Sequence, residues 1–225
     1  MQIDVFTLFP EWFGWFIEQR HVQNSFRAGH DLRFFNYRDT TPLSHGQVDD
    51  APYGGGAGMV IRVDVVDAAL TAVYGDVENL LAGRRVAMLT PAGRIFDDAV
   101  AAELAGVEAL TLLCGRYEGI DERVREHLTN DAISIGRYVL SGGELAAMVV
   151  MDAVVRKLPG ALGSGESVVE ESFSESLAGA PEYPHYTRPA EYRGWRVPEV
   201  LVSGDHERVR RWRLEQSGAR DSGLR

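Results

Sequence analysis

Residues that build cross-links, metal clusters and nucleophilic triads are scarce in this sequence. Cys114 is the only cysteine, so an internal disulfide and a cysteine-rich metal cluster are both excluded. The six histidines have no metal-ligand spacing, and no His-Glu-x-x-His or Gly-x-Ser-x-Gly motif occurs. These absences argue against a metalloenzyme and against a serine hydrolase.

Long apolar runs are also missing. No stretch of about 18 apolar residues is present, so we expect no membrane-spanning helix. The first residues have the pattern of a strand and lack the basic start and the cleavage site of a signal peptide. We therefore expect a soluble cytoplasmic protein.

The glycine-rich segment 53–58, Tyr-Gly-Gly-Gly-Ala-Gly, lacks the residues that bind phosphates in two known motifs. No Gly-Lys-Ser/Thr follows it, and Met59 stands where a dinucleotide-binding fingerprint has glycine. A packed or flexible loop is the favoured interpretation, and a role beside an active site stays open.

Lysine is nearly absent, and arginine carries the positive charge. Lys157 is the only lysine, and the formal net charge of −10 argues against a protein that coats nucleic acid. Between His185 and Arg213, however, seven arginines stand against four acids. A local basic patch of this kind attracts a phosphate backbone even when the whole protein is acidic.

The alternation of apolar segments predicts an α/β fold with a layered, mostly parallel sheet. Strands are expected at 2–9, 32–37, 85–89, 109–113 and 132–135, with a turn at 90–93. Helices are expected at 11–19, 64–74, 97–104, 121–128 and 144–158, with Asp64 capping the second.

The composition changes after Pro159, which ends the last of these helices. Segment 160–176 is rich in glycine, serine and glutamate, which predicts a flexible linker. Beyond it, 177–225 has its own apolar residues and a basic helix from about 205 to 216, capped by Asp205. We expect domains at 1–159 and 177–225, joined by this linker.

Two glycine-rich loops follow predicted strands. Segment 114–121 reads Cys-Gly-Arg-Tyr-Glu-Gly-Ile-Asp, and segment 134–144 reads Ser-Ile-Gly-Arg-Tyr-Val-Leu-Ser-Gly-Gly-Glu. Glycine lets a backbone approach a ligand closely, and the free peptide N–H groups of a helix start can bond it. These loops predict a small-molecule site built largely from main chain.

Six segments in one order resemble the bacterial tRNA (guanine-N1)-methyltransferases of the SPOUT, or trefoil-knot, class. The segments are 49–56, the turn at Thr90-Pro91, 114–119, 134–144, 184–189 (Pro-His-Tyr-Thr-Arg-Pro) and 203–206 (Ser-Gly-Asp-His). The resemblance extends over nearly the whole chain.

The resemblance implies a deep trefoil knot in domain 1–159, which is a rare exception among protein folds. It implies a small, mainly helical C-terminal domain that binds tRNA, and a homodimer whose active site lies between the subunits. S-adenosylmethionine would donate a methyl group to N1 of the guanine that lies 3′ of the anticodon.

The same resemblance implies that three loops hold the donor, at 89–93, 114–119 and 134–143. Met88 would pack against adenine, and Arg137, where the family usually has aspartate, would contribute only its backbone. Glu118 is implied as a ligand of a required magnesium ion, although a plain turn carboxylate is an equal alternative. The implied donor-binding residues are Leu89, Thr90, Pro91, Gly115, Tyr117, Ser134, Ile135, Gly136, Arg137, Tyr138, Val139, Leu140, Gly142 and Gly143.

Guanine N1 carries a proton, so methyl transfer needs a base. A positioned carboxylate accelerates such a step by roughly 10²–10⁴-fold, and an arginine suits the charge that develops on O6. The resemblance places Glu171 at the base position, where the family has aspartate, with Glu170 as the fallback. Arg156 matches the family's catalytic arginine.

Candidates for tRNA contacts are His185, Tyr186, Arg188, Arg208, Arg211 and Arg213, although a plain surface role is open for each. Two alternative functions remain. One is a knotted methyltransferase that acts on another RNA, at a base or a ribose 2′-hydroxyl. The other is a non-catalytic RNA-binding relative, which the change from aspartate to Glu171 keeps possible.

Overall fold

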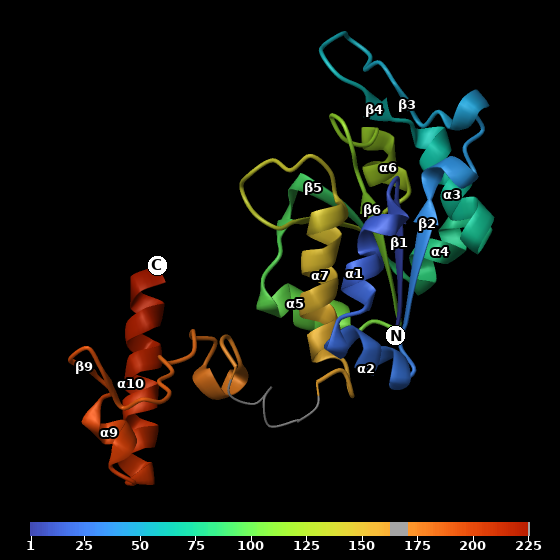
Figure 1. Cartoon of the computed structure of the whole chain (residues 1–225). Coiled ribbons are helices and arrows are strands. Elements are labelled where there is room, and N and C mark those ends of the chain that lie inside the picture. The colour runs from blue at the N-terminus through green and yellow to red at the C-terminus, as the bar shows by residue number, and fades with distance from the viewer. Residues whose placement is uncertain (163–170, 225) are drawn as a thin grey trace. The chain divides into compact units, whose positions relative to one another are not determined.

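The computed structural model of the chain describes residues 1–162 and 171–224. The chain divides into two compact units, Met1–Gly163 and Ser164–Arg225 (Figure 1). The division falls inside segment 160–176, which the sequence analysis interprets as a linker.

The first unit is built on a five-stranded sheet in the order β2-β1-β6-β5-β7, and every neighbouring pair is parallel. This confirms the predicted α/β class. Because the strands are parallel, their carboxyl ends meet at one edge, where such folds bind ligands. The strands are β1 Gln2–Thr7, β2 Asp31–Asn36, β5 Arg85–Ile95, β6 Ala109–Cys114 and β7 Asp131–Ser134.

Helices cover both faces of this sheet (Figure 1). One apolar cluster joins the sheet to α1 Gly14–Ile17, α2 Arg20–Arg27, α5 Asp98–Ala105 and α7 Glu144–Lys157. A second cluster lies under α3 Val63–Tyr74, α4 Val77–Gly83 and α6 Glu122–His127. The result is a three-layer arrangement with a core on each side of the sheet.

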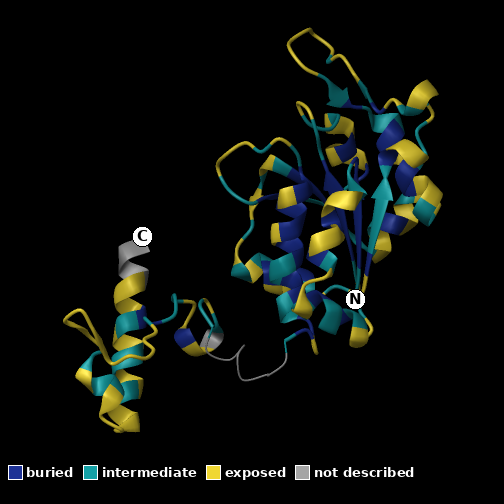
Figure 2. Ribbon diagram, viewed as in Figure 1, coloured by how far each residue is buried: buried dark blue, intermediate teal, exposed yellow. Residues whose placement is uncertain are grey.

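The central strands β1 and β6, the first half of β5 and the inner face of α7 are buried (Figure 2). Val150, Met151 and Val154 of α7 are fully buried, whereas Leu145 and Val149 on the same helix are 55% and 47% exposed. Each fully buried apolar side chain contributes roughly 1.5–3 kcal/mol. The helix therefore has one face in the core and a second apolar face that is open in the single chain.

Several local expectations need correction. The helix predicted at 11–19 is a 3-10 turn, η1 Pro10–Phe13, followed by the short α1, because Pro10 starts the turn and the helix breaks before Arg20. Asp64 is not a cap: Arg62 holds the cap position of α3, and its guanidinium donates to Asp64 at 3.0 and 2.8 Å. These hydrogen bonds lower the pKa of the Asp64 carboxyl.

Strand β5 also differs from the expectation of a strand that ends at Leu89. It leaves its pairing with β7 after Leu89 and resumes that pairing at Arg94. Segment 90–93 is therefore an excursion within one strand rather than the end of it. Helix α4 has no counterpart in the sequence analysis.

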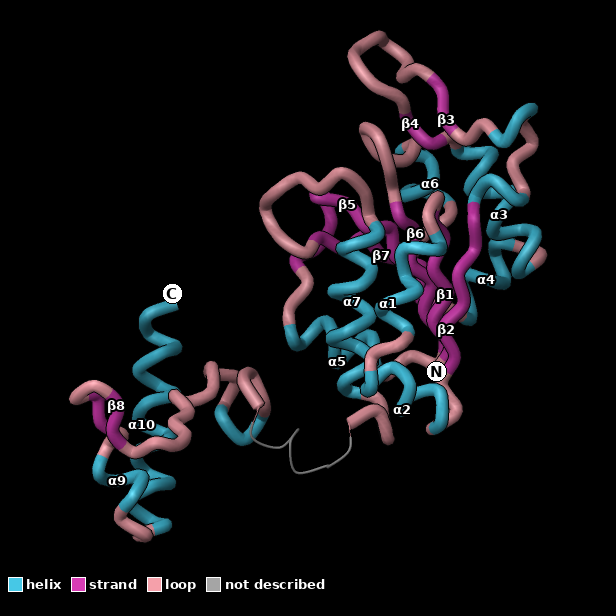
Figure 3. Tube along the Cα trace, viewed as in Figure 1, coloured by secondary structure: helices cyan, strands magenta, loops and turns pink. Residues whose placement is uncertain are grey.

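Segment 37–61 contains several short elements around the glycine-rich segment 53–58. It contains η2 Tyr37–Asp39, η3 Ser44–Gly46, and an antiparallel hairpin of β3 Asp49–Asp50 and β4 Val60–Ile61. Figure 3 shows this hairpin toward the same end of the sheet as the loops that follow β6 and β7. The glycine-rich segment 53–58 is the connection of the hairpin.

The second unit is small, and its longest element is α10 His206–Leu224. Asp205 precedes this helix, and its carboxylate accepts a hydrogen bond from Arg208 N at 3.1 Å, as a cap does. The other elements are η4 Glu175–Leu177, the antiparallel hairpin of β8 Glu191–Tyr192 and β9 Trp195–Arg196, and α9 Glu199–Val202. In the described parts of both units, no helix has the length and apolar character needed to cross a bilayer.

A buried ionic cluster ties the sheet to α3. Asp4 of β1 is completely buried and accepts hydrogen bonds from Arg33, Arg84 and the hydroxyl of Tyr74. Burial, followed by the hydrogen bond to Asp4, raises the pKa of Tyr74. Asp4 is the counter-charge of the nearly buried Arg84, which is 9% exposed, and of the partly exposed Arg33, so removing the carboxylate leaves Arg84 uncompensated.

We predict that Asp4→Ala lowers the free energy of unfolding by about 3–5 kcal/mol, since it leaves two arginines without their buried counter-charge. Urea unfolding measures this loss. The exposed Asp39→Ala is the matched control and should change stability by no more than about 0.5 kcal/mol. An equal effect of both substitutions would contradict the role assigned to Asp4.

Candidate functional site

A cavity of about 290 Å³ lies at the carboxyl ends of β6 and β7 and at the point where β5 leaves its pairing with β7. This volume is near the lower end of the roughly 300–1,000 Å³ typical of small-molecule sites. Its walls come from three segments, 88–91, 115–122 and 133–143, and from Ala146 at the start of α7. The cavity therefore occupies the edge of the sheet where the topology predicts a ligand.

Most of the residues predicted to hold the donor meet at this cavity. Met88 and Glu118 also line it, whereas the exposed Arg137 is not among the lining residues. The predicted residues that do line it are Leu89, Thr90, Pro91, Gly115, Tyr117, Ser134, Ile135, Gly136, Tyr138, Val139, Leu140, Gly142 and Gly143.

Sequence reasoning missed several lining residues, namely Arg116, Gly119, Ile120, Glu122, Ile133 and Ala146. Those within or next to segment 114–121 could have been found, because that loop was already singled out by its glycines. Ile133 and Ala146 had no such signal, because their apolar side chains were expected in the core.

The loops after β6 and β7 touch backbone to backbone. Gly143 N donates to Gly115 O at 2.8 Å, and Arg116 and Gly142 form a β-bridge. A Cβ on Gly143 would lie 2.7 Å from Cys114 Cα, much closer than carbon atoms approach without bonding. Only glycine fits here, and the close contact fixes two walls of the cavity to each other.

The loop 134–143 also folds on itself. Ser134 Oγ lies 3.3 Å from Gly136 N and 3.1 Å from Gly136 O, and the Tyr138 hydroxyl donates to Ile135 O at 3.1 Å. The ring of Tyr138 lies where a side chain at Gly136 would stand. These bonds stabilise the loop without a ligand, which reduces the ordering cost of binding.

A buried carboxylate stands behind the cavity at the first residue of α7. Glu144 is 1% exposed, and its Oε1 accepts a hydrogen bond from the Thr7 hydroxyl at 2.9 Å. Its Oε2 lies 3.7 Å from Arg116 Nη1, whose guanidinium stacks on the rings of Phe9 and Trp12 at 4.9 and 5.3 Å. The lining residue Arg116 is thus held from two sides.

The buried titratable groups beside Glu144 are not suited to nucleophilic chemistry. Burial, and then the charge of Glu144, raises the pKa of the Cys114 thiol. Burial likewise raises the pKa of the Tyr37 hydroxyl. Both groups are therefore protonated at neutral pH, and a protonated thiol is a poor nucleophile.

The β3–β4 hairpin packs on the second cavity loop. Glu118 N donates to Met59 O at 3.0 Å, and Ile61 N donates to Gly119 O at 3.0 Å. A Cβ on Gly58 would collide with the Glu118 side chain. Segment 53–58 is thus next to a lining residue, although it is not itself among the lining residues.

Glu118 and Glu122 supply the carboxylates of the lining. In residues 1–162 and 171–224, no group of three or more histidine, cysteine, aspartate or glutamate side chains is close enough to hold a metal ion. Magnesium often keeps several waters and uses only one or two carboxylates, but the residues present do not build a metal site by themselves. The role of Glu118 stays a prediction.

The predicted catalytic residues belong to different units. Arg156 lies half-buried in the last turn of α7. Glu171 is half-buried in the second unit, where its carbonyl accepts a hydrogen bond from Ser174 N at 3.1 Å. Glu170 lies outside the described residues. The pairing of a linker acid with Arg156 therefore stays a prediction.

The predicted tRNA contacts all lie in the second unit. Five of them are exposed: His185, Tyr186, Arg188, Arg208 and Arg211. The sixth, Arg213, is half-buried, and its guanidinium lies 4.7 Å from the centre of the Tyr183 ring.

Two exposed aromatic residues of the same unit were missed. Tyr192 and Trp195 face each other across the β8–β9 hairpin and are 53% and 69% exposed. Arg193 lies over the Tyr192 ring at 5.3 Å. The alternation of aromatic residues and arginines in 192–196 was the signal that could have identified them, since this mixture suits stacking on RNA bases.

Comparison with known proteins gives consistent matches. A family model described as tRNA (Guanine-1)-methyltransferase TrmD matches residues 1–225. The tRNA (guanine-N(1)-)-methyltransferase of Brevibacillus brevis is 49% identical over 226 residues, covering 100% of this chain and 90% of the relative. The enzyme of that name from Pelotomaculum thermopropionicum is 51% identical over 221 residues, covering 96% of this chain and 85% of the relative. The enzyme of that name from Bacillus cereus is 49% identical over 218 residues, covering 96% of this chain and 87% of the relative.

We predict that Gly143→Ala weakens binding of S-adenosylhomocysteine and lowers stability by about 1–3 kcal/mol, the usual range for overpacking. The added methyl meets backbone atoms, which cannot rotate away. Calorimetric titration and thermal unfolding measure the two effects. Gly83→Ala, at an exposed site with open space around it, is the control. The prediction is wrong if the two variants behave alike.

Proposed function

We propose, because the chain belongs to the tRNA (guanine-1)-methyltransferase family, that it transfers a methyl group from S-adenosylmethionine to N1 of the guanine 3′ of the anticodon in tRNA. The observation that carries this proposal is a family match over the whole chain, together with a cavity at the loops where the donor is expected. The relatives' names specify tRNA, guanine and its N1 atom.

The cavity suits the donor in its chemistry. Leu89, Ile133 and Leu140 supply apolar surface for an adenine ring, and the glycines of loops 115–119 and 136–143 leave main-chain groups accessible. When bound, S-adenosylmethionine supplies an electrophilic methyl group on a sulfonium. This chain's own task is to hold the donor, to orient the guanine and to accept a proton.

Glu171 and Arg156 carry the proposed chemistry. As N1 of guanine forms a bond to the methyl carbon, the bond from that carbon to sulfur breaks, and its electron pair leaves with the thioether. The N1 proton passes to the carboxylate of Glu171. Arg156 stabilises the negative charge that grows on guanine O6, because a guanidinium remains charged at every relevant pH.

This mechanism needs residues from both units, and we propose that a homodimer assembles them. Leu145, Val149 and Arg156 share one face of α7, at the spacing i, i+4 and i+11. The first two are the exposed apolar residues of that face, and Ala146 of the same helix lines the cavity. An apolar contact on this face would place the partner subunit next to Arg156.

We propose further that the first unit carries the trefoil knot of its class. The supporting observation is that the chain leaves β7 at one edge of the sheet and then returns to the loop after β6 through the bond between Gly143 and Gly115. We propose also that magnesium binds through Glu118 with water molecules as its other ligands, since this ion can use a single carboxylate. A cytoplasmic location completes the proposal, because tRNA is modified there.

We predict that Glu171→Ala reduces formation of 1-methylguanosine by about 10²–10⁴-fold, the contribution of a positioned base, while donor binding is kept. Nuclease digestion and mass spectrometry of the treated tRNA measure the product. Glu171→Asp should restore most of the activity, and the neighbouring Glu170→Ala should have little effect. If Glu170→Ala loses activity and Glu171→Ala keeps it, the base is Glu170. A product other than 1-methylguanosine would contradict the proposed function.

We predict that salt weakens tRNA binding but hardly changes donor binding. Each phosphate contact adds about −0.7 to −0.9 to the slope of log affinity against log salt concentration. Arg208→Gln and Arg211→Gln should each make the slope less steep by about that amount. Filter binding at several salt concentrations measures it. Equal slopes for tRNA and for S-adenosylhomocysteine would remove the role of the second unit's arginines.

A further inference from the structure

One wall of the cavity depends on how β5 leaves the sheet and returns. Ile133 of β7 pairs with Leu89 and again with Arg94, so segment 90–93 protrudes from the ladder between them. Thr90 and Pro91 of this protrusion line the cavity. The point at which β5 rejoins β7 therefore sets the position of this wall.

The return is a close backbone contact at Gly93. A Cβ at this position would lie 2.4 Å from Ile133 N, which no side chain permits. Phe96 N then donates to Ser134 O at 2.8 Å, and pairing continues. Side chains add to the backbone pairing at this return.

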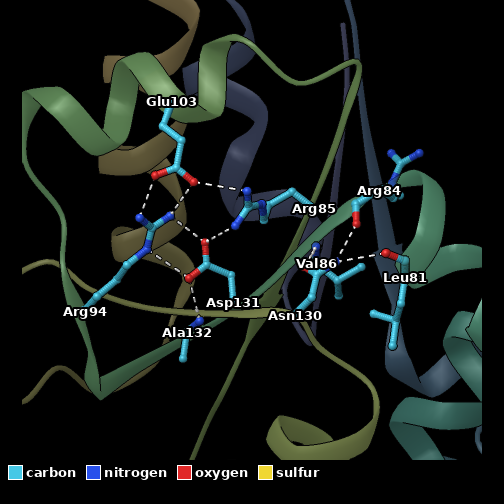
Figure 4. A network of polar contacts seen from close by, with 9 residues as sticks. All are labelled: Leu81, Arg84, Arg85, Val86, Arg94, Glu103, Asn130, Asp131 and Ala132. Carbon is cyan, nitrogen blue, oxygen red and sulfur yellow. Dashed lines mark hydrogen bonds and ion pairs between the residues drawn. The ribbon is translucent and has the colours of Figure 1, made fainter.

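Arg94 stabilises this return, because its guanidinium bonds two carboxylates at once (Figure 4). Its Nε and Nη2 donate to the two oxygens of Asp131, at 3.0 and 2.7 Å. Its Nη1 and Nη2 donate to the two oxygens of Glu103 on α5, at 2.7 and 3.1 Å. One guanidinium thus joins the end of β5 to the start of β7 and to a helix.

The same two acids also hold the start of β5. Arg85 lies 3.1 Å from Glu103 and 3.4 Å from Asp131, so both ends of the strand meet at one pair of carboxylates. The Asp131 side chain is only 7% exposed, whereas Arg94 and Glu103 are 37% and 41% exposed. Hydrogen bonds to Glu103, and then to Asp131, raise the pKa of Arg94, and those from Arg94 lower the pKa of Glu103.

None of these four charged residues lines the cavity. We propose that Arg94, Glu103 and Asp131 form a clamp that holds segment 90–93 in place before the donor arrives, and that Arg94 is a positioning residue for S-adenosylmethionine. The inference deepens the proposed function and rests on it.

The clamp depends on the planar geometry of the Arg94 guanidinium as well as on its charge. A planar guanidinium meets two carboxylates at once, whereas a lysine ammonium is a single point that cannot pair with both in this way. When the clamp is loose, the donor must order segment 90–93 as it binds, and that cost lowers its affinity. The chemical step itself is not affected, because Arg94 contacts none of the reacting groups.

Arg94→Lys tests the clamp. We expect the dissociation constant for S-adenosylhomocysteine, measured by calorimetry, to rise roughly tenfold, the size typical of residues that influence a site without touching the ligand. The KM for the donor should rise in parallel, whereas kcat at saturating donor and the affinity for tRNA should stay unchanged. Glu103→Gln changes a side chain that is 41% exposed on α5 and should weaken donor binding in the same direction.

Arg33→Lys is the matched control. Arg33 makes the same forked contact, with Nε and Nη2 each 2.8 Å from the buried Asp4, but it lies on β2 at the opposite edge of the sheet. This variant should lose stability without losing donor affinity. Unchanged donor affinity in both Arg94→Lys and Glu103→Gln, or an equal loss in Arg33→Lys, would overturn the clamp. A wild-type protein that binds no donor would instead overturn the proposed function, and the clamp with it.

Discussion

The close contact between the loops after β6 and β7 is the constraint on which the site depends. Gly143 lies against Cys114 and Gly115 with no room for a side chain, and its N–H bonds across to the other loop. This contact brings the carboxyl ends of two strands together and leaves main-chain groups facing a cavity. The glycines of these loops and the apolar side chains beside them line one cavity, so the shape of the cavity depends on how the two loops pack.

The two units divide the work of the proposed reaction. The first unit holds the cavity, and Arg156 lies on the helix that begins at it. The second unit holds Glu171 and a surface with exposed arginines and aromatic rings. In the proposed mechanism, proton removal from guanine N1 therefore depends on residues of both units.

Two walls of the cavity could be predicted from the glycine loops that follow apolar strands, and the third, at 89–93, was implied by the resemblance to the family. The sheet could be predicted for a similar reason, since buried strands are apolar throughout. The point where β5 resumes its pairing with β7 could not be predicted, because Arg94 there bonds Asp131, 37 residues away, and Glu103 of α5. The orientation of the Arg116 guanidinium could not be predicted either, because it depends on Glu144 and on two rings from the start of the chain.

The most direct test of the central claim is a crystal structure of the protein with S-adenosylhomocysteine. We expect the ligand in the cavity between segments 88–91, 115–120 and 133–143, with its adenine held mainly by main-chain groups. A ligand bound elsewhere on the chain, or a cavity left empty at saturating ligand, would contradict the account.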